Sequence, residues 1–384
     1  MKKLYDLLTV IFFCAIVGIF SVAFLIIPDR DFSEQENRHL QQAPSFSKES
    51  FFSGEFAEKI NLYFSDQFPL RDAFVKLKGA SELALLKGEN NGVLYSYDQL
   101  AVKDFDFYIS AIEIVQDTDR IDNSVIESRL TGVNRLSETL DVPLITVIPP
   151  RTVDIADSQF GYDRPDGDSV FELMNDTFSE KSGFINTLSP LRERYENGEY
   201  VYYRTDHHWT TLGAYYTYCD IMKQLGKTDK IIPISEFEIE QVESFSGTTA
   251  ARANFPFYKK DVLEIWHLPD DGEYNVTADG ETLTGFYERT HLETSDKYSV
   301  FLDGTHNLTT ITKNNSSRET LVIAKDSFAN CLIPFLAREY DIVAVDLKSN
   351  LNISAISEEY NADAVLIVYN TENLITTNDL KKVR

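Results

Sequence analysis

The chain has 384 residues, of which 43% are hydrophobic, so it is long enough to bury a large core in one large or two medium domains. Its formal net charge at pH 7 is −25. A protein this acidic repels the phosphates of nucleic acids, which excludes nucleic acid as an expected partner. The acidic residues are spread through a sequence with 26 Phe and 20 Tyr, which indicates a folded protein with a charged surface.

The amino-terminal segment predicts a membrane helix. Residues 7–27 carry no charge, and their number matches the ~20 residues that a helix needs to cross a bilayer. Lys2 and Lys3 before this run predict a cytoplasmic amino terminus and an external body in a single-pass protein of the cell membrane. The alternative is a cleaved signal peptide, because Ser21 and Ala23 resemble a cleavage site. The apolar run continues past Ala23, which favours the retained anchor.

Residues 29–92 predict a helical amino-terminal region, in which apolar and charged residues alternate at helical spacing over 51–68. Asp66, Arg71 and Asp72 flank a Phe-Pro-Leu turn. They indicate either a binding site or, as we favour, a salt-bridged turn that docks this region on the main domain.

The next part of the chain alternates strand and helix patterns. Strand-type segments at 93–95 and 100–102 predict a hairpin, and residues 142–148 form an apolar run typical of a buried parallel strand. Tyr- and Val-rich residues 199–203 predict a short strand. Helices are expected at 124–140, 169–179 and 211–225.

The carboxy-terminal third repeats the strand pattern, with three more buried strands expected at 320–324, 341–347 and 364–369. The alternation predicts an α/β/α sandwich with a parallel sheet covered on both faces. Between residues 231 and 317, short segments separated by Asp-Gly and Asn-rich turns indicate an antiparallel β insertion, which is a candidate cap over the functional site. Its expected strands are 275–277, 282–284 and 298–301.

Three cysteines complete the inventory. Cys14 lies in the apolar amino-terminal run, so only Cys219 and Cys331 are available for a disulfide. Both fall on predicted helix faces, which favours buried free thiols. The chain has no C-x-x-C motif, so a zinc or redox framework has no support.

The densest chemistry lies at Thr205-Asp206-His207-His208-Trp209, between the expected strand at 199–203 and the helix at 211–225. This stretch resembles the signature of the DHHW family of bacterial cell-surface proteins, related to alginate O-acetyltransferases within the SGNH-hydrolase-like superfamily. A later Lys325-Asp326-Ser327-Phe328 turn matches the superfamily's nucleophile motif. The resemblance continues in the stretches Phe32 to Arg38, Asp66 to Asp72 and Tyr298 to Gly304.

The resemblance assigns a catalytic triad that the residue chemistry supports. A serine hydroxyl needs a neighbouring base to attack a carbonyl at neutral pH, and imidazole serves because it is mostly neutral there. We expect Ser327 as nucleophile, His208 as base and Asp206 as the carboxylate that orients the ring. Ser327 follows a buried strand and begins a helix expected to break at Pro334, so its amide is the first oxyanion-hole candidate. Gly247 and Gly304 are weaker candidates. The triad order is permuted relative to ordinary SGNH hydrolases.

Several of these residues have simpler interpretations. Ser327 is also a good helix cap, and Asp206 with the two histidines suggests a metal, although residues two apart supply only two ligands on one face, so we expect none. His207 should point away from His208 and make a structural hydrogen bond. Trp209 either stacks on a sugar or lies in the core. Arg204 either binds an anionic sugar or pairs with Asp206. We count His207, Trp209, Arg204 and Tyr298 as substrate-binding candidates.

The resemblance implies an SGNH-like (flavodoxin-like) catalytic domain over residues 93–384, with its β-rich insertion at about 231–317, a helical region at 29–92 and an anchor at 1–28. It further implies extracytoplasmic O-acylation, in the simplest form O-acetylation, of a cell-envelope or secreted polysaccharide. No cofactor is implied. The expected partners are the polysaccharide and a multi-spanning membrane acyltransferase that donates the acyl group. The alternatives are an acetylesterase with the same triad and a non-catalytic glycan-binding or scaffold protein.

Overall fold

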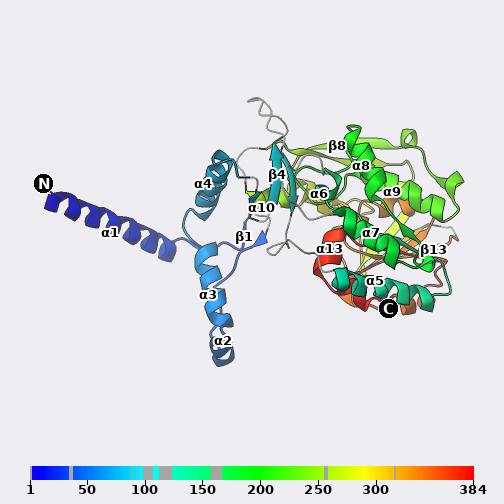
Figure 1. Cartoon of the computed structure of the whole chain (residues 1–384), viewed down its shortest axis with the longest axis horizontal. Coiled ribbons are helices and arrows are strands. Elements are labelled where there is room, and N and C mark those ends of the chain that lie inside the picture. The colour runs from blue at the N-terminus through cyan, green and yellow to red at the C-terminus, as the bar shows by residue number, and fades with distance from the viewer. Residues whose placement is uncertain are drawn as a thin grey trace. The chain divides into compact units, whose positions relative to one another are not determined.

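The computed structural model describes the chain except for residues 1, 34–37, 88, 92, 98–106, 112–122, 157–166, 255–257 and 315–316. It divides the chain into two compact units, one built on residues 1–87 and the other on most of residues 88–384 (Figure 1). The proposed boundary between the helical region and the catalytic domain, near residue 92, lies close to this division. The assignment of the three segments to separate domains stays a prediction.

The first unit is mainly helical. Its helices are α1 (Lys2–Ile26), α2 (Lys48–Ser53), α3 (Glu55–Asp66) and α4 (Arg71–Ala84), and its two short strands are β1 (Phe32–Ser33) and β2 (Arg38–His39). Helix α1 is long and apolar enough to cross a membrane over Lys3–Ile26, which fits either an anchor or a signal sequence. Part of the expected motif at 32–38 lies outside the described residues.

The turn between α3 and α4 is salt-bridged, as the sequence predicted. The guanidinium of Arg38 donates to both oxygens of Asp66, at 2.6 and 2.9 Å, and Arg71 lies 3.6 Å from the same carboxylate. Arg30 binds Asp72 at 2.7 Å. Burial opposes ionisation of Asp66, but the hydrogen bonds from Arg38 and the Gln41 amide, together with the charges of Arg38 and Arg71, outweigh burial and lower the pKa of this carboxyl. Docking of this turn on the second unit stays a prediction.

The second unit is built on an eight-stranded sheet with the order β11-β10-β12-β14-β13-β15-β6-β7. Five neighbouring strands run parallel, namely β14 (Asp341–Asp346), β13 (Thr320–Lys325), β15 (Ala364–Val368), β6 (Leu144–Val147) and β7 (Phe184–Ile185). The strands β12 (Leu308–Lys313), β10 (Tyr274–Ala278) and β11 (Glu281–Thr282) extend it in antiparallel fashion. The large mixed, mainly parallel sheet confirms the expected α/β class.

Helices cover this sheet on both faces. The chain steps from β13 to β14 through α11 (Ile333–Leu336), then returns past β13 to β15 through α12 (Ile353–Glu359). Because parallel crossovers are right-handed, these opposite steps place α11 and α12 on opposite faces of the sheet. The carboxyl end of β13 lies where the crossovers diverge, which is where open α/β sheets bind ligands.

The remaining helices join one or the other layer. Helix α5 (Asn123–Thr139) contacts α7 (Gly167–Thr177), α13 (Thr371–Thr376) and α14 (Asp379–Lys382), whereas α9 (Thr211–Gln224) contacts α11. Two short helices, α6 (Thr152–Ile155) and α8 (Leu188–Glu196), contact each other (Figure 1). The predicted helices at 124–140, 169–179 and 211–225 are confirmed, as are the four predicted buried strands.

Some predicted elements are wrong. Residues 199–203 form no strand, because Val201 and Tyr203 pair only with the chain that follows immediately, through the Thr210 amide and the His208 carbonyl. The first strand of the expected hairpin is longer than predicted, since β4 (Val93–Tyr97) includes residues 96 and 97 and pairs with β3 (Glu89–Asn90) and β5 (Phe107–Ala111). The predicted second strand at 100–102 lies outside the described residues.

The β insertion is antiparallel, as expected, and its predicted strands at 275–277 and 282–284 overlap β10 and β11. Its strands β10, β11 and β12 continue the main sheet, while β8 (Glu238–Phe245) and β9 (Asp261–His267) form a two-stranded ribbon. The short helix α10 (Thr248–Ala253) lies between β8 and β9 in the chain. Residues 298–301 were expected as a strand, but the first three lie in a 3-10 helix (Lys297–Val300) and Phe301 makes an isolated bridge with Tyr287. The antiparallel pairing of β12 with β14 lets the insertion share the main core.

We predict that Ile323→Ala lowers the free energy of unfolding by about 2–5 kcal/mol, because it removes buried methyl groups from the middle of β13 and leaves a cavity. Ile323 is fully buried between β14 and β15. Chemical denaturation followed by tryptophan fluorescence measures the loss. Ile239→Ala in β8, where the side chain is 39% exposed, is the matched control and should change stability by much less.

Candidate active site

The candidate site is a chain of hydrogen bonds that joins Asp206, His208 and Ser327. Asp206 and His208 lie on the loop before α9, and Ser327 is the first residue of a 3-10 turn (Ser327–Ala329) directly after β13. Oδ1 of Asp206 lies 2.5 Å from Nδ1 of His208, and Nε2 of His208 lies 2.7 Å from Oγ of Ser327. The structure therefore brings together the three predicted residues, although the serine is 119 positions from the histidine.

Asp206 is buried and accepts four hydrogen bonds. Its Oδ1 also accepts the backbone amide of His208 at 3.1 Å, and its Oδ2 accepts the amide and hydroxyl of Thr248 at 2.9 and 3.1 Å. Burial alone would raise the pKa of Asp206, but electrostatic attraction to the two histidine rings and these hydrogen bonds outweigh burial and hold the pKa well below its usual value. Asp206 is therefore ionised at neutral pH.

This network assigns the tautomer of His208. An ionised Asp206 can only accept, so Nδ1 of His208 carries the proton and Nε2 is left to accept the hydroxyl proton of Ser327. The His208 ring is nearly parallel to that of Tyr298, with 3.8 Å between the centroids and 9° between the planes. Phe328 lies 4.8 Å from the His208 ring. Two aromatic side chains thus hold the imidazole and shield it from water.

Ser327 is poised by its place at the end of the strand. Asp326 caps the 3-10 turn by accepting the amide of Phe328 at 3.0 Å, and the amide of Asn370 anchors the other oxygen of Asp326 at 2.7 Å. Burial raises the pKa of Asp326 despite these bonds. Among the described residues, no acceptor binds the amide of Ser327 itself. This amide is therefore available to a negatively charged oxygen beside Oγ.

The predicted helix after Ser327 is shorter than expected. It consists of the 3-10 turn and the four-residue α11, and Pro334 lies in the first turn of α11. The break therefore precedes the proline, because proline is well accommodated at a helix start.

The two glycines predicted as oxyanion candidates have other roles. The amide of Gly247 donates to Oγ1 of Thr205 at 3.1 Å, and a side chain on Gly247 would lie 2.2 Å from Cβ of Asp206. The amide of Gly304 donates to the carbonyl of Phe301, and the Gly304 carbonyl accepts Nδ2 of Asn330 at 2.8 Å. Neither amide is available in this arrangement, so both assignments are wrong. Gly247 instead allows the insertion to approach Asp206 closely.

The substrate-binding candidates also separate. Trp209 is fully buried, and its Nε1 donates to the carbonyl of Phe328 at 3.0 Å, so the core interpretation is confirmed and stacking on a sugar is wrong. Tyr298 is 5% exposed and lies against His208 rather than facing solvent. Its hydroxyl donates to Sγ of Cys331 at 3.2 Å. Cys219 and Cys331 are both free thiols, as the sequence favoured, but only Cys331 is buried and Cys219 is partly exposed.

His207 and Arg204 remain at the rim of the site. The His207 ring packs against that of His208, with 3.8 Å between the centroids, so the expectation that it points away is wrong. The reason is that residues 204–208 form a sequence of bends rather than an extended strand. Nδ1 of His207 lies 2.9 Å from Oγ1 of Thr248, which is the structural hydrogen bond expected. The guanidinium of Arg204 lies 5.0 Å above the ring of Tyr200.

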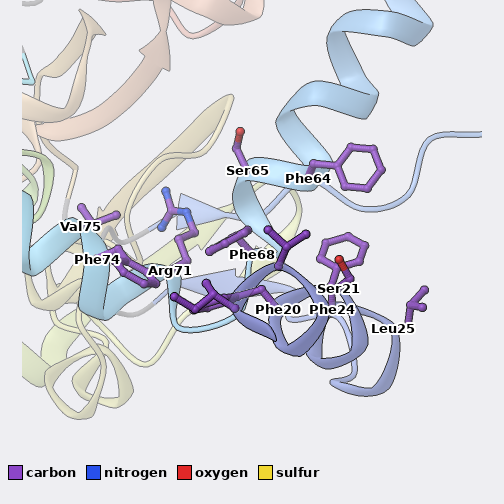
Figure 2. A pocket seen from close by; sticks show the side chains of 12 residues that line it. Phe20, Ser21, Phe24, Leu25, Phe64, Ser65, Phe68, Arg71, Phe74 and Val75 are labelled. Carbon is purple, nitrogen blue, oxygen red and sulfur yellow. The ribbon is translucent and has the colours of Figure 1, made fainter. Parts of the chain in front are cut away.

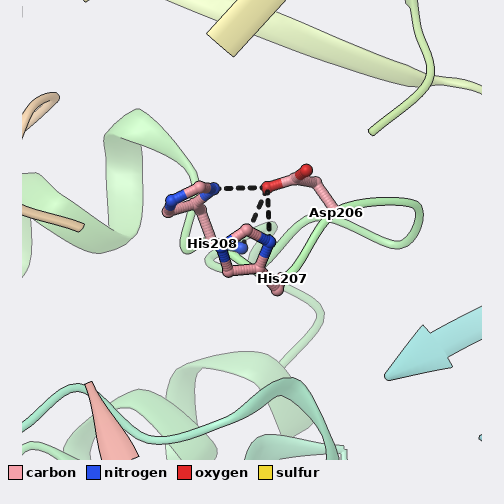
Figure 3. A group of neighbouring side chains, drawn as sticks. All are labelled: Asp206, His207 and His208. Carbon is pink, nitrogen blue, oxygen red and sulfur yellow. Dashed lines mark hydrogen bonds and ion pairs between the residues drawn. The ribbon is translucent and has the colours of Figure 1, made fainter. Parts of the chain in front are cut away.

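Asp206, His207 and His208 are also close enough together to suggest a metal site. Asp206, His207 and His208 each offer a ligand atom within 4.8 Å of the others (Figure 3). However, both ring nitrogens of His208 are engaged, by Asp206 and Ser327, and the near nitrogen of His207 is engaged by Thr248. A metal would have to replace these hydrogen bonds. The donor set therefore fits a proton-transfer chain better than a metal.

Sequence reasoning missed one buried carboxylate that holds the site loop. Asp261, at the start of β9, accepts the amide and hydroxyl of Thr205 at 2.8 and 2.5 Å and the amide of Arg204 at 3.1 Å. The hydroxyl of Tyr200 also donates to it. Burial raises the pKa of Asp261 even though these hydrogen bonds oppose the shift. No local pattern marks this residue, because its partners lie 56–61 positions away.

Fold and site together define an α/β protein with a serine, a histidine and a carboxylate in hydrogen-bond sequence at the carboxyl edge of a mainly parallel sheet. The family model for DHHW protein matches residues 187–346, which include all three residues. This match confirms the resemblance to the DHHW family. No curated protein matches the chain.

Two solved structures with TM-scores above 0.5 support the fold, and a third is less similar. A DHHW family protein from Eubacterium siraeum is 19% identical with a TM-score of 0.61, covering 77% of this chain and 95% of that one. Bacillus cereus PatB1, solved with a sulfonyl adduct, is 20% identical with a TM-score of 0.59, covering 68% and 93%. The O-acetyltransferase domain of Pseudomonas putida AlgJ is 13% identical with a TM-score of 0.46, covering 76% and 95%.

We predict that Gly247→Ala lowers the melting temperature and disturbs the Asp206–His208 pair, because the new methyl group would collide with the Asp206 side chain at a distance that no Cβ contact tolerates. Thermal denaturation measures the loss, and the downfield proton signal of a histidine bound to a carboxylate reports on the pair. Gly272→Ala is the control, because nothing lies within 4 Å of the added methyl group. Equal melting temperatures for the two variants would contradict the packing role of Gly247.

Proposed function

We propose that this protein is an extracytoplasmic O-acyltransferase, in the simplest form an O-acetyltransferase, that modifies a cell-envelope or secreted polysaccharide. The observation that carries the proposal is the continuous chain from Asp206 through His208 to Ser327, with distances of 2.5 and 2.7 Å. Donor and acceptor distances of this kind are those that general-base activation of a hydroxyl requires. The permuted order, with the histidine before the serine, agrees with the family resemblance.

The first half of the reaction acylates the serine. Oγ of Ser327 attacks the carbonyl carbon of an acyl donor while Nε2 of His208 accepts the hydroxyl proton, and ionised Asp206 stabilises the imidazolium that forms. The amide of Ser327 donates to the oxyanion of the tetrahedral intermediate, a contribution typically worth about 3 kcal/mol of the barrier. The intermediate collapses when the bond to the leaving group breaks, and His208 returns its proton to that group.

The second half transfers the acyl group. A sugar hydroxyl takes the place of the leaving group, His208 accepts its proton, and its oxygen attacks the acyl-serine ester. The ester bond to Oγ breaks, and His208 protonates Ser327. Burial of His208 between Tyr298 and Phe328 supports transfer over hydrolysis, because water must be kept from the ester.

Two further features belong to the proposal. Helix α1 anchors the protein with the second unit outside the cell, and a multi-spanning membrane acyltransferase supplies acyl groups to Ser327. The sulfonyl adduct carried by the PatB1 structure suits the proposed nucleophile, because sulfonyl electrophiles react with activated hydroxyl groups.

We predict that the protein, incubated with a small acetyl ester, gains one acetyl group on Ser327 and that Ser327→Ala gains none. Mass spectrometry of the proteolysed protein locates the group. Ser349→Ala is the control, because Ser349 also follows a parallel strand but its hydroxyl donates to the backbone carbonyl of Asp346. Adding an oligosaccharide separates the outcomes: an acetylated sugar indicates a transferase, and acetate alone indicates an esterase. Absence of any adduct on wild-type protein would support a binding or scaffold role.

We predict that Asp206→Asn preserves the fold and lowers turnover by about 10⁴. The asparagine oxygen can keep the hydrogen bonds from Thr248, but its amide group would then donate to Nδ1 of His208 and leave Nε2 protonated, so that His208 could not accept the proton of Ser327. Steady-state kinetics with the acetyl ester measures the loss, and circular dichroism checks the fold. Asp220→Asn, which removes only a surface ion pair with Lys223, should keep normal rates. A wild-type rate for Asp206→Asn would refute the triad.

A further inference from the structure

The first unit contains an apolar groove that the proposed reaction does not use. The groove has a volume of about 1060 Å³ and lies between α1, α3 and α4 (Figure 2). Figure 2 shows the side chains of Phe20 and Phe68 close together, with Phe74 beside them. Apart from Arg71 and two serines, the lining side chains are all apolar.

Aromatic contacts attach the junction of α3 and α4 to the carboxyl half of α1. The ring of Phe20 stacks on that of Phe68, with 5.2 Å between centroids, and lies 5.8 Å from that of Phe74. One turn later, Phe24 lies 5.2 Å from Phe64 and 5.7 Å from Tyr63. These contacts determine how far along α1 the junction sits.

The same contacts place the junction at the depth of the outer leaflet. At ~1.5 Å per residue, Phe20 lies about 8 Å beyond the middle of the Lys3–Ile26 span, toward its outer end. Half of a hydrocarbon core of about 30 Å is about 15 Å, so the ring of Phe20 lies among acyl chains when α1 spans the membrane. Phe68 and Phe74, which touch Phe20, must then lie in the same layer.

The side chains around the groove have the character that this layer requires. Phe64, Leu70, Phe74 and Leu77 are between 46% and 68% exposed on α3, α4 and the turn between them. Several large apolar side chains exposed on neighbouring segments are uncommon on a soluble protein and mark a contact with membrane or protein. The charged residues of the turn are paired, Arg38 with Asp66 and Arg30 with Asp72.

The charge distribution agrees with lipid as the occupant. Residues 1–87 hold ten Lys and Arg against eleven Asp and Glu, so nearly the whole net charge of −25 lies in residues 88–384. An acidic surface is repelled by the negative surface of a bacterial membrane, whereas a nearly neutral one is not. The apolar face is thus on the part of the chain that electrostatics allows to approach the bilayer.

We propose that the α3–α4 junction is a membrane-seated platform, in which Phe64, Phe68, Leu70 and Phe74 lie among the acyl chains of the outer leaflet and lipid fills the groove against α1. The platform rests on the proposed anchoring by α1 and adds a second, shallow membrane contact. Two membrane contacts hold the start of the external part at the bilayer surface. With α1 as the single contact, this part would be free to move away from the surface.

Depth-dependent fluorescence quenching of the full chain in phosphatidylcholine vesicles tests the platform. Cys14→Ser and Cys219→Ser remove the accessible thiols, and Cys331 is too buried to react. A fluorophore is then attached in single variants Phe64→Cys, Leu70→Cys or Phe74→Cys. We expect nitroxide groups on the lipid acyl chains to remove most of the fluorescence at these three positions, and iodide in the water to leave it nearly unchanged.

Two further positions calibrate the measurement. Ile11→Cys, 54% exposed on α1, reports the anchor, and Glu58→Cys, exposed on α3 six residues before Phe64, should be quenched by iodide. Lipid quenching at Ile11 with iodide quenching at the three platform positions would overturn the platform and leave the anchor standing. Iodide quenching at Ile11 would overturn both. Protection from both quenchers at the platform positions would show that protein, as a second copy of the chain, fills the groove instead of lipid.

Discussion

The site depends on one buried carboxylate that holds an irregular loop in place. Residues 204–208 have no regular secondary structure, so their backbone amides cannot be satisfied by a neighbouring strand or helix turn. Asp261 satisfies two of these amides and the hydroxyl of Thr205 from the first residue of β9. A buried carboxylate that accepts several hydrogen bonds resists displacement, so Asp261 fixes the position of Thr205. Asp206, the next residue in the chain, is thereby held in place as well.

Apart from Asp261, the parts of the site come from separate elements of the fold. The loop before α9 carries Asp206 and His208. The insertion carries Thr248 and Tyr298, and Ser327 follows the end of β13. The insertion therefore contributes contacts to the site itself. It saturates the second oxygen of Asp206 and supplies the ring that lies flat against His208, so that the imidazole can rotate little without breaking both contacts.

The two units of the chain separate two physical tasks. The second unit carries nearly all of the negative charge and a single large core. The first unit is almost neutral and exposes aromatic side chains along α3 and α4. This division explains how one chain can combine a strongly acidic surface with segments that prefer an apolar environment.

The sequence by itself determined the features that depend on neighbouring residues. The continuous apolar runs at 144–147, 321–324 and 364–368 identify buried strands, and helical spacing identifies α5, α7 and α9. Asp206 and His208 are two residues apart, so their pairing was predictable as well. Only the tertiary structure decided what depends on strand order and long loops: the anchoring by Asp261, the donors from Thr248, the burial of Trp209 and the packing of Gly247 against Asp206. Most of these features join residues that are distant in the chain, and the burial of Trp209 is one that local patterns leave undecided. Hydrophobic periodicity shows which face of a helix or strand is covered, but it does not show which residue covers it.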